Sequence, residues 1–338
     1  MKKPLISVVI ATYNSDRTLA LCLRSLKTQK FPREKIELII ADGGSTDQTL
    51  LIAKQFQARV VKVPADKQGA EYNKAYGLQY AKGEYLLCID HDNILPHSNW
   101  LTAMMYPFSQ HKDLVAVEPL RYRYQPNLSL LDRYFALFGV NDPLPYYLGK
   151  ADRMDYFHQK YNLLGQAQDK GEYYLVRFNQ DQPQKIPTLG ANGFLIKRKY
   201  FLKSRHQPGE YFHIDINVDL VAQGYNQYAF IKDDIIHLTN SEFINFVVRR
   251  AYFMNKYYLA DFSKRRYRVF YLENDGIKLL LFIVYAITLI KPLLDSLRGY
   301  IKIKDKAWFL HPPMCLAMVV VYGQTFVIGM IRKVLHAK

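Results

Sequence analysis

Short apolar runs alternate with helical patterns along the first part of the chain. Residues 5–11 form a continuous β-branched run, which is typical of a strand buried on both faces. Asn14, Ser15 and Asp16 can cap a following helix, in which leucines recur at helical spacing. This alternation predicts a mostly parallel sheet flanked by crossover helices, and hence an α/β fold. The other predicted strands are 35–42, 60–64 and 83–90, and the other predicted helices are 49–56 and 70–81.

Polar clusters follow three of these strands at the points where the apolar runs stop. Ligands bind parallel sheets at the carboxyl ends of the strands, and these ends meet at one edge of the sheet. Any single cluster is ordinary turn chemistry, because Asp, Asn and Gly are turn residues. Three clusters on the same edge predict a ligand site instead. They are Thr12-Tyr13-Asn14, Asp42-Gly43-Gly44-Ser45 and Asp90-His91-Asp92.

The pattern becomes irregular between about residues 97 and 180, where only 127–140 predicts an amphipathic helix. An apolar strand is predicted at 186–201, broken by Gly190 and Gly193. The last elements before the tail are a helix at 213–225, for which Gly224 is a suitable C-cap, and one or two strands at 228–239.

The tail is basic, aromatic and apolar. Its first apolar stretch, 277–290, is shorter than the roughly 20 residues that span a bilayer, and its second, 314–331, is marginal. Basic residues precede, separate and follow the two stretches, so charge does not settle a topology. The stretches predict either a shallow membrane hairpin or helices that lie in the membrane interface. A soluble helical subdomain is the alternative.

Composition indicates an anionic partner, from the large positive charge, and a reducing compartment, from the few cysteines. The net charge of +16 over 338 residues implies an anionic partner, which is nucleic acid, an anionic membrane surface or a phosphorylated substrate. Cys22, Cys88 and Cys315 lie far apart in apolar settings, which indicates buried thiols in the cytoplasm and no zinc site. The N-terminus predicts a first strand better than a signal peptide. Neither a dinucleotide-binding glycine motif nor a P-loop is present.

Asp90 and Asp92 form a D-x-D pair at the end of a predicted strand. Carboxylate oxygens in this arrangement suit a hard divalent cation such as Mg²⁺ or Mn²⁺. Such a cation neutralises the charge that develops on a diphosphate leaving group. A phosphatase uses a similar pair after the first strand of its domain, followed by a small hydroxyl residue. Here the pair follows the fourth strand and precedes Asn93, which disfavours that alternative.

The motifs SVVIATYN, ELIIADGGSTD and GEYLLCIDHD, in this order and spacing, resemble family 2 glycosyltransferases of the GT-A fold over residues 5–240. The resemblance implies that Tyr13 and Asp42 contact the base and ribose of a nucleotide-sugar. It implies that Asp90 faces the ribose and diphosphate and that Asp92 binds the metal. The other predicted nucleotide-sugar contacts are Thr12, Asn14 and Asn73.

The chain departs from the family pattern at two places. Tyr72 precedes Asn73 where the family often has Arg, which leaves the identity of the nucleotide open. The family's inverting members use a carboxylate base, usually in a Glu-Asp motif. Here Ile214 precedes Asp215, so we predict Asp215 as the base and keep Asp219, one helical turn later, as its alternative.

Two further groups complete the predicted site. A glycine-rich loop would let the acceptor or the donor sugar approach the backbone closely. His237, after the last strand, is a further candidate metal ligand, whereas His91 is expected to point away from the metal. The loop residues are Gly190, Ala191, Asn192 and Gly193.

These observations predict a metal-dependent inverting glycosyltransferase with a catalytic domain at 1–240 and a membrane-associating helical region at 241–338. The expected partners are a nucleotide-sugar donor and a membrane-linked acceptor, a glycolipid or polyprenyl-linked saccharide, at the cytoplasmic face of the cell membrane. An alternative is transfer to polyprenyl phosphate, held by basic residues near Arg249 and Arg250. Alternatives of another class are a nucleic-acid-binding module and an inactive sugar-binding protein. The sequence favours no nucleic-acid partner, because it lacks a recognition motif.

Overall fold

The computed structural model describes residues 4–239, 241–260 and 264–336. The chain divides into two compact units, each built from two segments. The sheet unit comprises Met1–Arg123 and Leu164–Leu238, and the helical unit comprises Tyr124–Leu163 and Thr239–Lys338. Residues 124–163, where the sequence pattern is irregular, therefore fold together with the C-terminal part of the chain.

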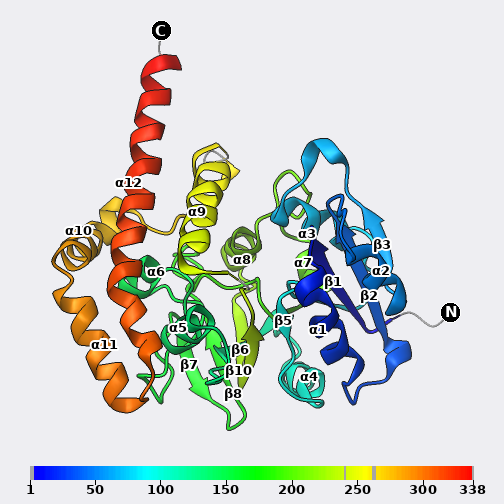
Figure 1. Ribbon diagram of the computed structural model, residues 1–338. Helices are drawn as coiled ribbons and strands as arrows, with labels where there is room; N and C mark the ends of the chain where they lie inside the picture. Colours follow the sequence, from blue (N-terminus) through cyan, green and yellow to red (C-terminus); the bar gives the residue numbers. More distant parts are fainter. Residues whose placement is uncertain (1–3, 240, 261–263, 337–338) are drawn as a thin grey trace. The chain divides into compact units, whose positions relative to one another are not determined.

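The first half of the sheet unit has the predicted parallel strands and crossover helices (Figure 1). Strand β1 lies between β2 and β4, and β3 lies at the edge beyond β2. The four strands carry the apolar runs, and every residue of β1 is buried, as its continuous β-branched pattern predicts. The elements are β1 (Ile6–Thr12), α1 (Asp16–Lys27), β2 (Ile36–Asp42), α2 (Thr49–Gln55), β3 (Arg59–Lys62), α3 (Ala70–Leu78) and β4 (Tyr85–Cys88).

The second half of the unit turns the sheet into a mixed one. Strand β9 runs antiparallel to both β4 and β6, and β10 runs parallel to β6 but antiparallel to β8. The described residues form a sheet of 10 strands in the order β3-β2-β1-β4-β9-β6-β10-β8-β7, with β5 paired to β10. The elements are β5 (Asn93–Ile94), α4 (Trp100–Gln110), β6 (Ala116–Tyr122), β7 (Gln166–Asp169), β8 (Tyr173–Arg177), β9 (Phe194–Lys197), α7 (Arg198–Phe201), α8 (His213–Ala222) and β10 (Gln227–His237).

The strand predicted at 186–201 is shorter than expected, because only β9 is extended and residues before it form a loop. Gly190 and Gly193 have positive φ angles of 113° and 81°, which a regular strand does not accommodate. The predicted helix and strand that follow are confirmed as α8 and β10.

The helical unit contains both predicted apolar stretches as helices. Within the described residues, the helical segment Lys306–Ile331, which comprises η5 and most of α12, is long and apolar enough to cross a membrane, whereas α10 and α11 meet this test only as a pair that is bent by 79°. The bend lies at Leu289, whose φ of 58° is left-handed. The elements are α5 (Leu130–Phe138), α6 (Pro143–Leu148), α9 (Phe243–Phe253), η3 (Met254–Ala260), α10 (Leu272–Thr288), α11 (Ile290–Lys302), η5 (Lys306–Leu310) and α12 (His311–His336).

Ion pairs with buried carboxylates connect the C-terminal helices of this unit to its first segment. Each pair joins residues more than a hundred positions apart, and each charge is compensated inside the unit, as buried charges require. The pairs are Lys150–Asp275 at 2.6 Å, Arg250–Asp142 at 2.6 Å and Arg133–Asp305 at 2.8 Å.

Candidate functional site

The first two polar clusters meet at the carboxyl ends of β1 and β2, where Thr12 and Asp42 are register partners. The Thr12 hydroxyl donates a hydrogen bond of 3.0 Å to Oδ1 of Asp42. Oδ2 of Asp42 accepts from the backbone N–H groups of Gly44 and Ser45, at 3.0 and 2.9 Å. Asp42 is buried, so in this structure its carboxylate shapes the loop that follows β2.

Tyr13 and Asn14 form the exposed side of this cluster. The Tyr13 side chain is 61% exposed, which leaves its ring available for stacking. Asn14 adopts a φ of 48°, and its Oδ1 accepts a hydrogen bond of 2.9 Å from the backbone N–H of Thr46. The loops after β1 and β2 are therefore held against each other, with the tyrosine ring presented to solvent.

Asp90 follows β4 and is bound by a lysine that the sequence did not single out. Lys74, on α3, is buried and places its Nζ 2.7 Å from Oδ1 of Asp90. Burial lowers the pKa of Lys74, but the carboxylates of Asp90 and Glu71 outweigh burial and raise it overall. Lys74 is thus a fixed positive charge that compensates Asp90. The Asp90 side chain is still 33% exposed.

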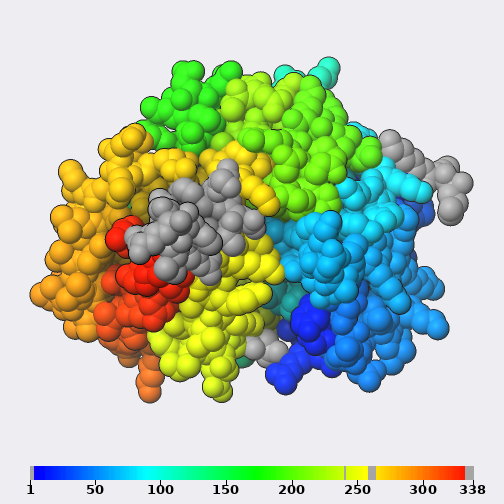
Figure 2. Space-filling model, turned by 90° about the horizontal axis from the view of Figure 1, so that it is seen from above, coloured from blue at the N-terminus to red at the C-terminus, as the bar shows by residue number. Residues whose placement is uncertain are grey.

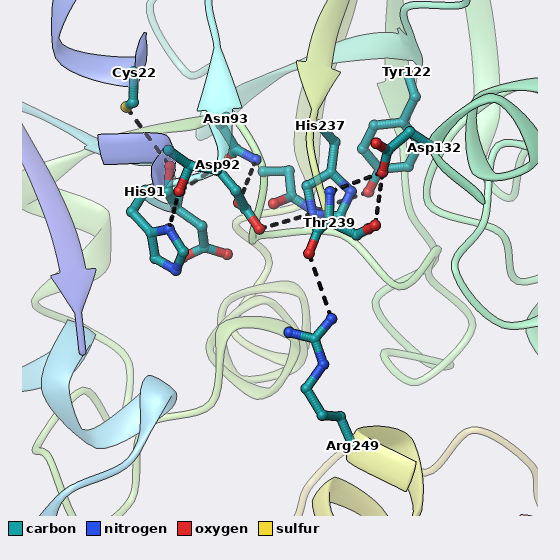
Figure 3. A network of polar contacts seen from close by, with 12 residues as sticks. Cys22, His91, Asp92, Asn93, Tyr122, Asp132, His237, Thr239 and Arg249 are labelled. Carbon is teal, nitrogen blue, oxygen red and sulfur yellow. Dashed lines mark hydrogen bonds and ion pairs between the residues drawn. The ribbon is translucent and has the colours of Figure 1, made fainter. Parts of the chain in front are cut away.

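Asp92 lies opposite His237, the last residue of β10 (Figure 3). The Nε2 atom of His237 and Oδ2 of Asp92 are 3.5 Å apart, and the backbone N–H of Leu238 donates to the Asp92 carbonyl. The imidazole stacks on Tyr122, with ring centroids 5.5 Å apart. Burial raises the pKa of Asp92, but His237 opposes this effect and brings the pKa down to about 2.

The remaining residues of this turn hold it in shape. Oδ1 of Asn93 accepts from the Asp90 backbone N–H at 3.0 Å, and its Nδ2 donates to Oδ1 of Asp92 at 3.2 Å. The Nδ1 atom of His91 lies 2.7 Å from the Thr18 hydroxyl on α1, so the ring points away from His237 (Figure 3). Asn93 therefore fixes the spacing of the two aspartates.

A divalent cation fits the chemistry of Asp92 and His237. One carboxylate oxygen and one imidazole nitrogen face each other, and this mixed donor set suits Mn²⁺. Among the described residues, no group of three or more His, Cys, Asp or Glu side chains could hold a metal. The protein would thus supply only part of the coordination shell, as is usual for a cation that is shared with substrate phosphates.

Helix α3 also carries Asn73 and Glu71. Oδ1 of Asn73 accepts from the Gly69 backbone N–H at 3.1 Å, and its Nδ2 lies so close to Gly43 that a Cβ there would come within 2.5 Å of it. Asn73 therefore packs under the loop after β2. Glu71 contacts His213, the first residue of α8, through both of its carboxylate oxygens.

The glycine-rich loop rests on the N-terminus of α8. A Cβ at Gly190 would lie 2.5 Å from the His213 carbonyl oxygen, and the Gly190 N–H donates to Oε1 of Glu118 at 3.1 Å. Asn192 donates to the Tyr122 hydroxyl at 2.9 Å. Ala191 lies between these two anchored positions, and the N–H of Gly193 donates to the Cys88 carbonyl.

Helix α8 carries both predicted base residues, and the two lie in different surroundings. Asp215 is fully buried, with 0% of the residue exposed. Asp219 is bound by Arg205, which approaches it to 2.7 Å with NH2 and also donates its backbone N–H at 3.0 Å. The role of Asp215 as a base stays a prediction.

Sequence reasoning missed Lys74, Glu71, Asn93 and His213. Lys74 and Glu71 stand within the predicted helix 70–81, where a lysine and a glutamate read as solvent-exposed helix formers. The sequence does not show that both side chains are buried. Burial is possible because Asp90, 16 positions away, pairs with Lys74, and His213, 142 positions away, pairs with Glu71. Asn93 directly follows Asp92, and His213 begins the predicted helix that carries Asp215. This proximity in sequence was the only available signal for either residue.

Comparison with known proteins places these motifs in a family. Residues 7–201 match the model for glycosyl transferase family 2. The glycosyltransferase GlyG of Streptococcus pneumoniae is 33% identical over 124 residues, which are 36% of this chain and 40% of GlyG. The poly(ribitol-phosphate) beta-N-acetylglucosaminyltransferase TarS of Staphylococcus aureus is 28% identical over 116 residues, which are 33% of this chain and 20% of TarS. The chain thus matches less than half the length of either relative.

A solved structure supports the fold over nearly the whole chain. The mannosyltransferase PcManGT from Pyrobaculum calidifontis, in complex with GDP-Man and Mn²⁺, aligns with a TM-score of 0.52. The alignment covers 96% of this chain and 88% of that one at 12% sequence identity. At this identity the likeness shows the fold alone, and it confirms the predicted GT-A architecture. Because the family model matches more than half of its residues, the chain belongs to glycosyl transferase family 2.

Proposed function

We propose that this chain transfers a sugar from a nucleotide-sugar to an acceptor hydroxyl at a membrane surface, with inversion at the anomeric carbon and with a bound divalent cation. The observation that carries the proposal is the facing pair Asp92 and His237 at the end of a strand-edge cluster that also contains Asp42 and Asp90. Membership of glycosyl transferase family 2 supports the reaction class.

The donor's nucleoside would bind at the ends of β1 and β2. The exposed ring of Tyr13 offers a stacking surface for the base, and Asp42 stabilises the loop that would surround the ribose. Asn73 supports that loop from below. Asp90, whose charge Lys74 compensates, would accept hydrogen bonds from the ribose or the sugar rather than serve as the principal metal ligand.

Asp92 and His237 would hold the divalent cation. When bound, the cation neutralises the negative charge that develops on the departing nucleoside diphosphate. Asn93 keeps the Asp92 carboxylate in place, and Tyr122 supports the His237 ring. The remaining ligands would come from the donor's diphosphate and from water.

The helical unit would bind the membrane. Helix α11 buries Pro292, Asp295, Ser296 and Gly299 on one side, and on the other side its large apolar residues are exposed. Basic residues lie on and after the same helix, which is the composition of an interfacial helix that binds anionic lipids. Part of the surface of the helical unit, including α10 and α12, is seen in orange and red in Figure 2. The exposed apolar residues of α11 are Ile290, Leu293, Leu294, Leu297 and Ile301.

A donor screen tests the proposal. The purified protein is incubated with a panel of UDP-, GDP- and dTDP-sugars, with Mn²⁺, with Mg²⁺ or with EDTA, and donor hydrolysis is measured. We expect one donor to be hydrolysed in a cation-dependent manner. Asp92→Asn should abolish the stimulation by the cation, whereas Asp181→Asn, an exposed loop residue of the same unit, should leave it unchanged.

Two results would contradict the proposal. One is that no donor in the panel is bound or hydrolysed, together with salt-sensitive retention of the protein on RNA or DNA. The other is that Asp92→Asn retains full stimulation by Mn²⁺, which would place the cation elsewhere or remove it from the reaction.

A further inference from the structure

Helix α8 begins with a histidine whose ring is oriented by a buried carboxylate. Nδ1 of His213 lies 2.8 Å from Oε1 of Glu71, and the backbone N–H of His213 donates to Oε2 of the same residue at 3.1 Å. Glu71 is buried, and although burial raises its pKa, His213 and Lys74 bring that pKa down to about 2. Glu71 is thus an anion, which can only accept hydrogen bonds.

This contact defines which nitrogen of the ring is basic. Because an anionic carboxylate accepts the Nδ1–H, a neutral His213 carries its proton on Nδ1 and leaves the lone pair on Nε2. Among the described residues, no hydrogen bond to Nε2 of His213 is present. This arrangement is the one in which a carboxylate orients a histidine base and stabilises the imidazolium that forms.

A chain of charged side chains links His213 to Asp90. Glu71 and Lys74 are three residues apart on α3, so their side chains share one face of the helix, about 5–6 Å apart at Cβ. Lys74 in turn contacts Asp90 at 2.7 Å. His213, Glu71, Lys74 and Asp90 therefore form a continuous row that ends at the predicted diphosphate site.

The predicted acceptor loop packs against the same residue. Gly190 approaches the His213 carbonyl so closely that any Cβ at this position would clash with it. Of the three titratable side chains of α8, that of His213 is 14% exposed, whereas Asp215 is fully enclosed and Asp219 is bound by Arg205. His213 thus contacts both Glu71, which is linked to Asp90 through Lys74, and the loop predicted to meet the acceptor.

We propose that His213, oriented by Glu71, is the general base of the transfer reaction, in place of Asp215. This inference rests on the proposed function. Nε2 of His213 takes the proton of the acceptor hydroxyl as the acceptor oxygen forms its bond to the anomeric carbon of the donor sugar. The bond from that carbon to the diphosphate breaks, and the nucleoside diphosphate leaves with the electron pair. The imidazolium, stabilised by Glu71, then returns the proton to water.

Donor hydrolysis tests this proposal without knowledge of the natural acceptor, because water also needs a base. The assay uses whichever UDP-, GDP- or dTDP-sugar the wild-type protein hydrolyses fastest. We expect His213→Gln to lower the hydrolysis rate by about 10²- to 10⁴-fold, while the corresponding nucleoside diphosphate and Mn²⁺ still bind with wild-type affinity. Asp215→Asn should hydrolyse the donor at a rate within a few fold of the wild type.

Chemical rescue separates a base from a structural residue. Imidazole added to His213→Gly should restore part of the rate, and the same addition should leave Asp215→Asn unchanged. Glu71→Gln should lower the rate by about 10- to 100-fold. It should add nothing further to His213→Gln, because a positioning residue acts only through the group that it orients. A Glu71 that merely stabilised the fold would lower the rate in either background.

The outcomes distinguish this proposal from the broader one. If the wild-type protein hydrolyses a donor and His213→Gln does so at the same rate, the base is assigned wrongly and the proposed function stands. If Asp215→Asn is the inactive variant and imidazole does not rescue His213→Gly, Asp215 is the base. If the wild-type protein hydrolyses no donor of the panel, both proposals fail together.

Discussion

At the scale of single residues, the sequence identified the acidic residues of the site and His237, but it missed Lys74 and did not predict which side chains contact each carboxylate. Asp90 and Asp92 are recognisable because two carboxylates end an apolar run. Lys74 lies 16 positions from Asp90, and His237 lies 145 positions from Asp92. No local pattern in the sequence indicates these two contacts. Burial also bears on the role of a residue. Asp215 was predicted as the base from its place on a helix, but its complete enclosure is a property of the fold and is not visible in the sequence.

The acid stability of the protein should report on Glu71. Its pKa is held near 2, against an ordinary value of 4.5, so its pairing stabilises the fold above pH 4.5 and this contribution is lost as the pH falls towards 2. Across that window, the wild-type unfolding free energy should fall by up to about 1.4 kcal/mol per pH unit more steeply than that of Glu71→Gln. Urea denaturation of both proteins between pH 5.5 and 3 measures the two slopes. Parallel slopes would show that Glu71 is not an anion paired with His213.

At the scale of elements, the parallel strands and their helices followed from the sequence because each carries its own periodicity. The hairpin of β7 and β8 did not follow, and neither did the short length and antiparallel pairing of β9 within the strand predicted at 186–201, since short strands in a mixed sheet are defined by their partners. The loop before β9 was correctly marked by its glycines, but the reason became visible only in the fold. Gly190 has no room for a side chain, because α8 begins directly against it.

Alanine substitutions at three glycines should separate the destabilisation caused by steric crowding of a Cβ atom from that caused by a positive φ angle. Gly190→Ala combines a φ of 113° with a Cβ 2.5 Å from a carbonyl oxygen, and we expect it to destabilise the protein by at least about 2 kcal/mol. Gly149→Ala carries only a positive φ of 72°, with nothing within 4 Å, and should cost about 1 kcal/mol. Gly209→Ala has neither feature and should be close to neutral. Urea denaturation of the three variants gives this order, and a neutral Gly190→Ala would refute the close packing of the loop on α8.

At the scale of the whole molecule, charge and apolar surface are the features on which the proposed membrane binding depends. A net charge of +16 implies an anionic partner, and the sequence favoured a membrane over a nucleic acid because it lacks a nucleic-acid recognition motif. The structure adds that most of the large apolar side chains of α10 and α11 are exposed, although Phe282 is buried, while the polar residues Asp275 and Asp295 are buried. This inversion of the usual pattern of a soluble helix favours a lipid surface.

Membrane binding should therefore depend on the exposed leucines of α11. Leu293→Glu combined with Leu297→Glu removes two side chains, each of which contributes about 1.5–3 kcal/mol when buried in the lipid, and places negative charge against anionic headgroups. We expect at least a 100-fold loss of affinity for vesicles of phosphatidylcholine with 30% phosphatidylglycerol, measured by co-sedimentation. Leu51→Glu, which alters an equally exposed leucine on α2, is the matched control and should bind as the wild type does. Hydrolysis of the soluble donor should be unchanged in both variants, because neither touches the sheet-edge cluster. If the α11 variant still sediments with the vesicles, the interfacial role of this helix is wrong and α12 alone would have to anchor the protein.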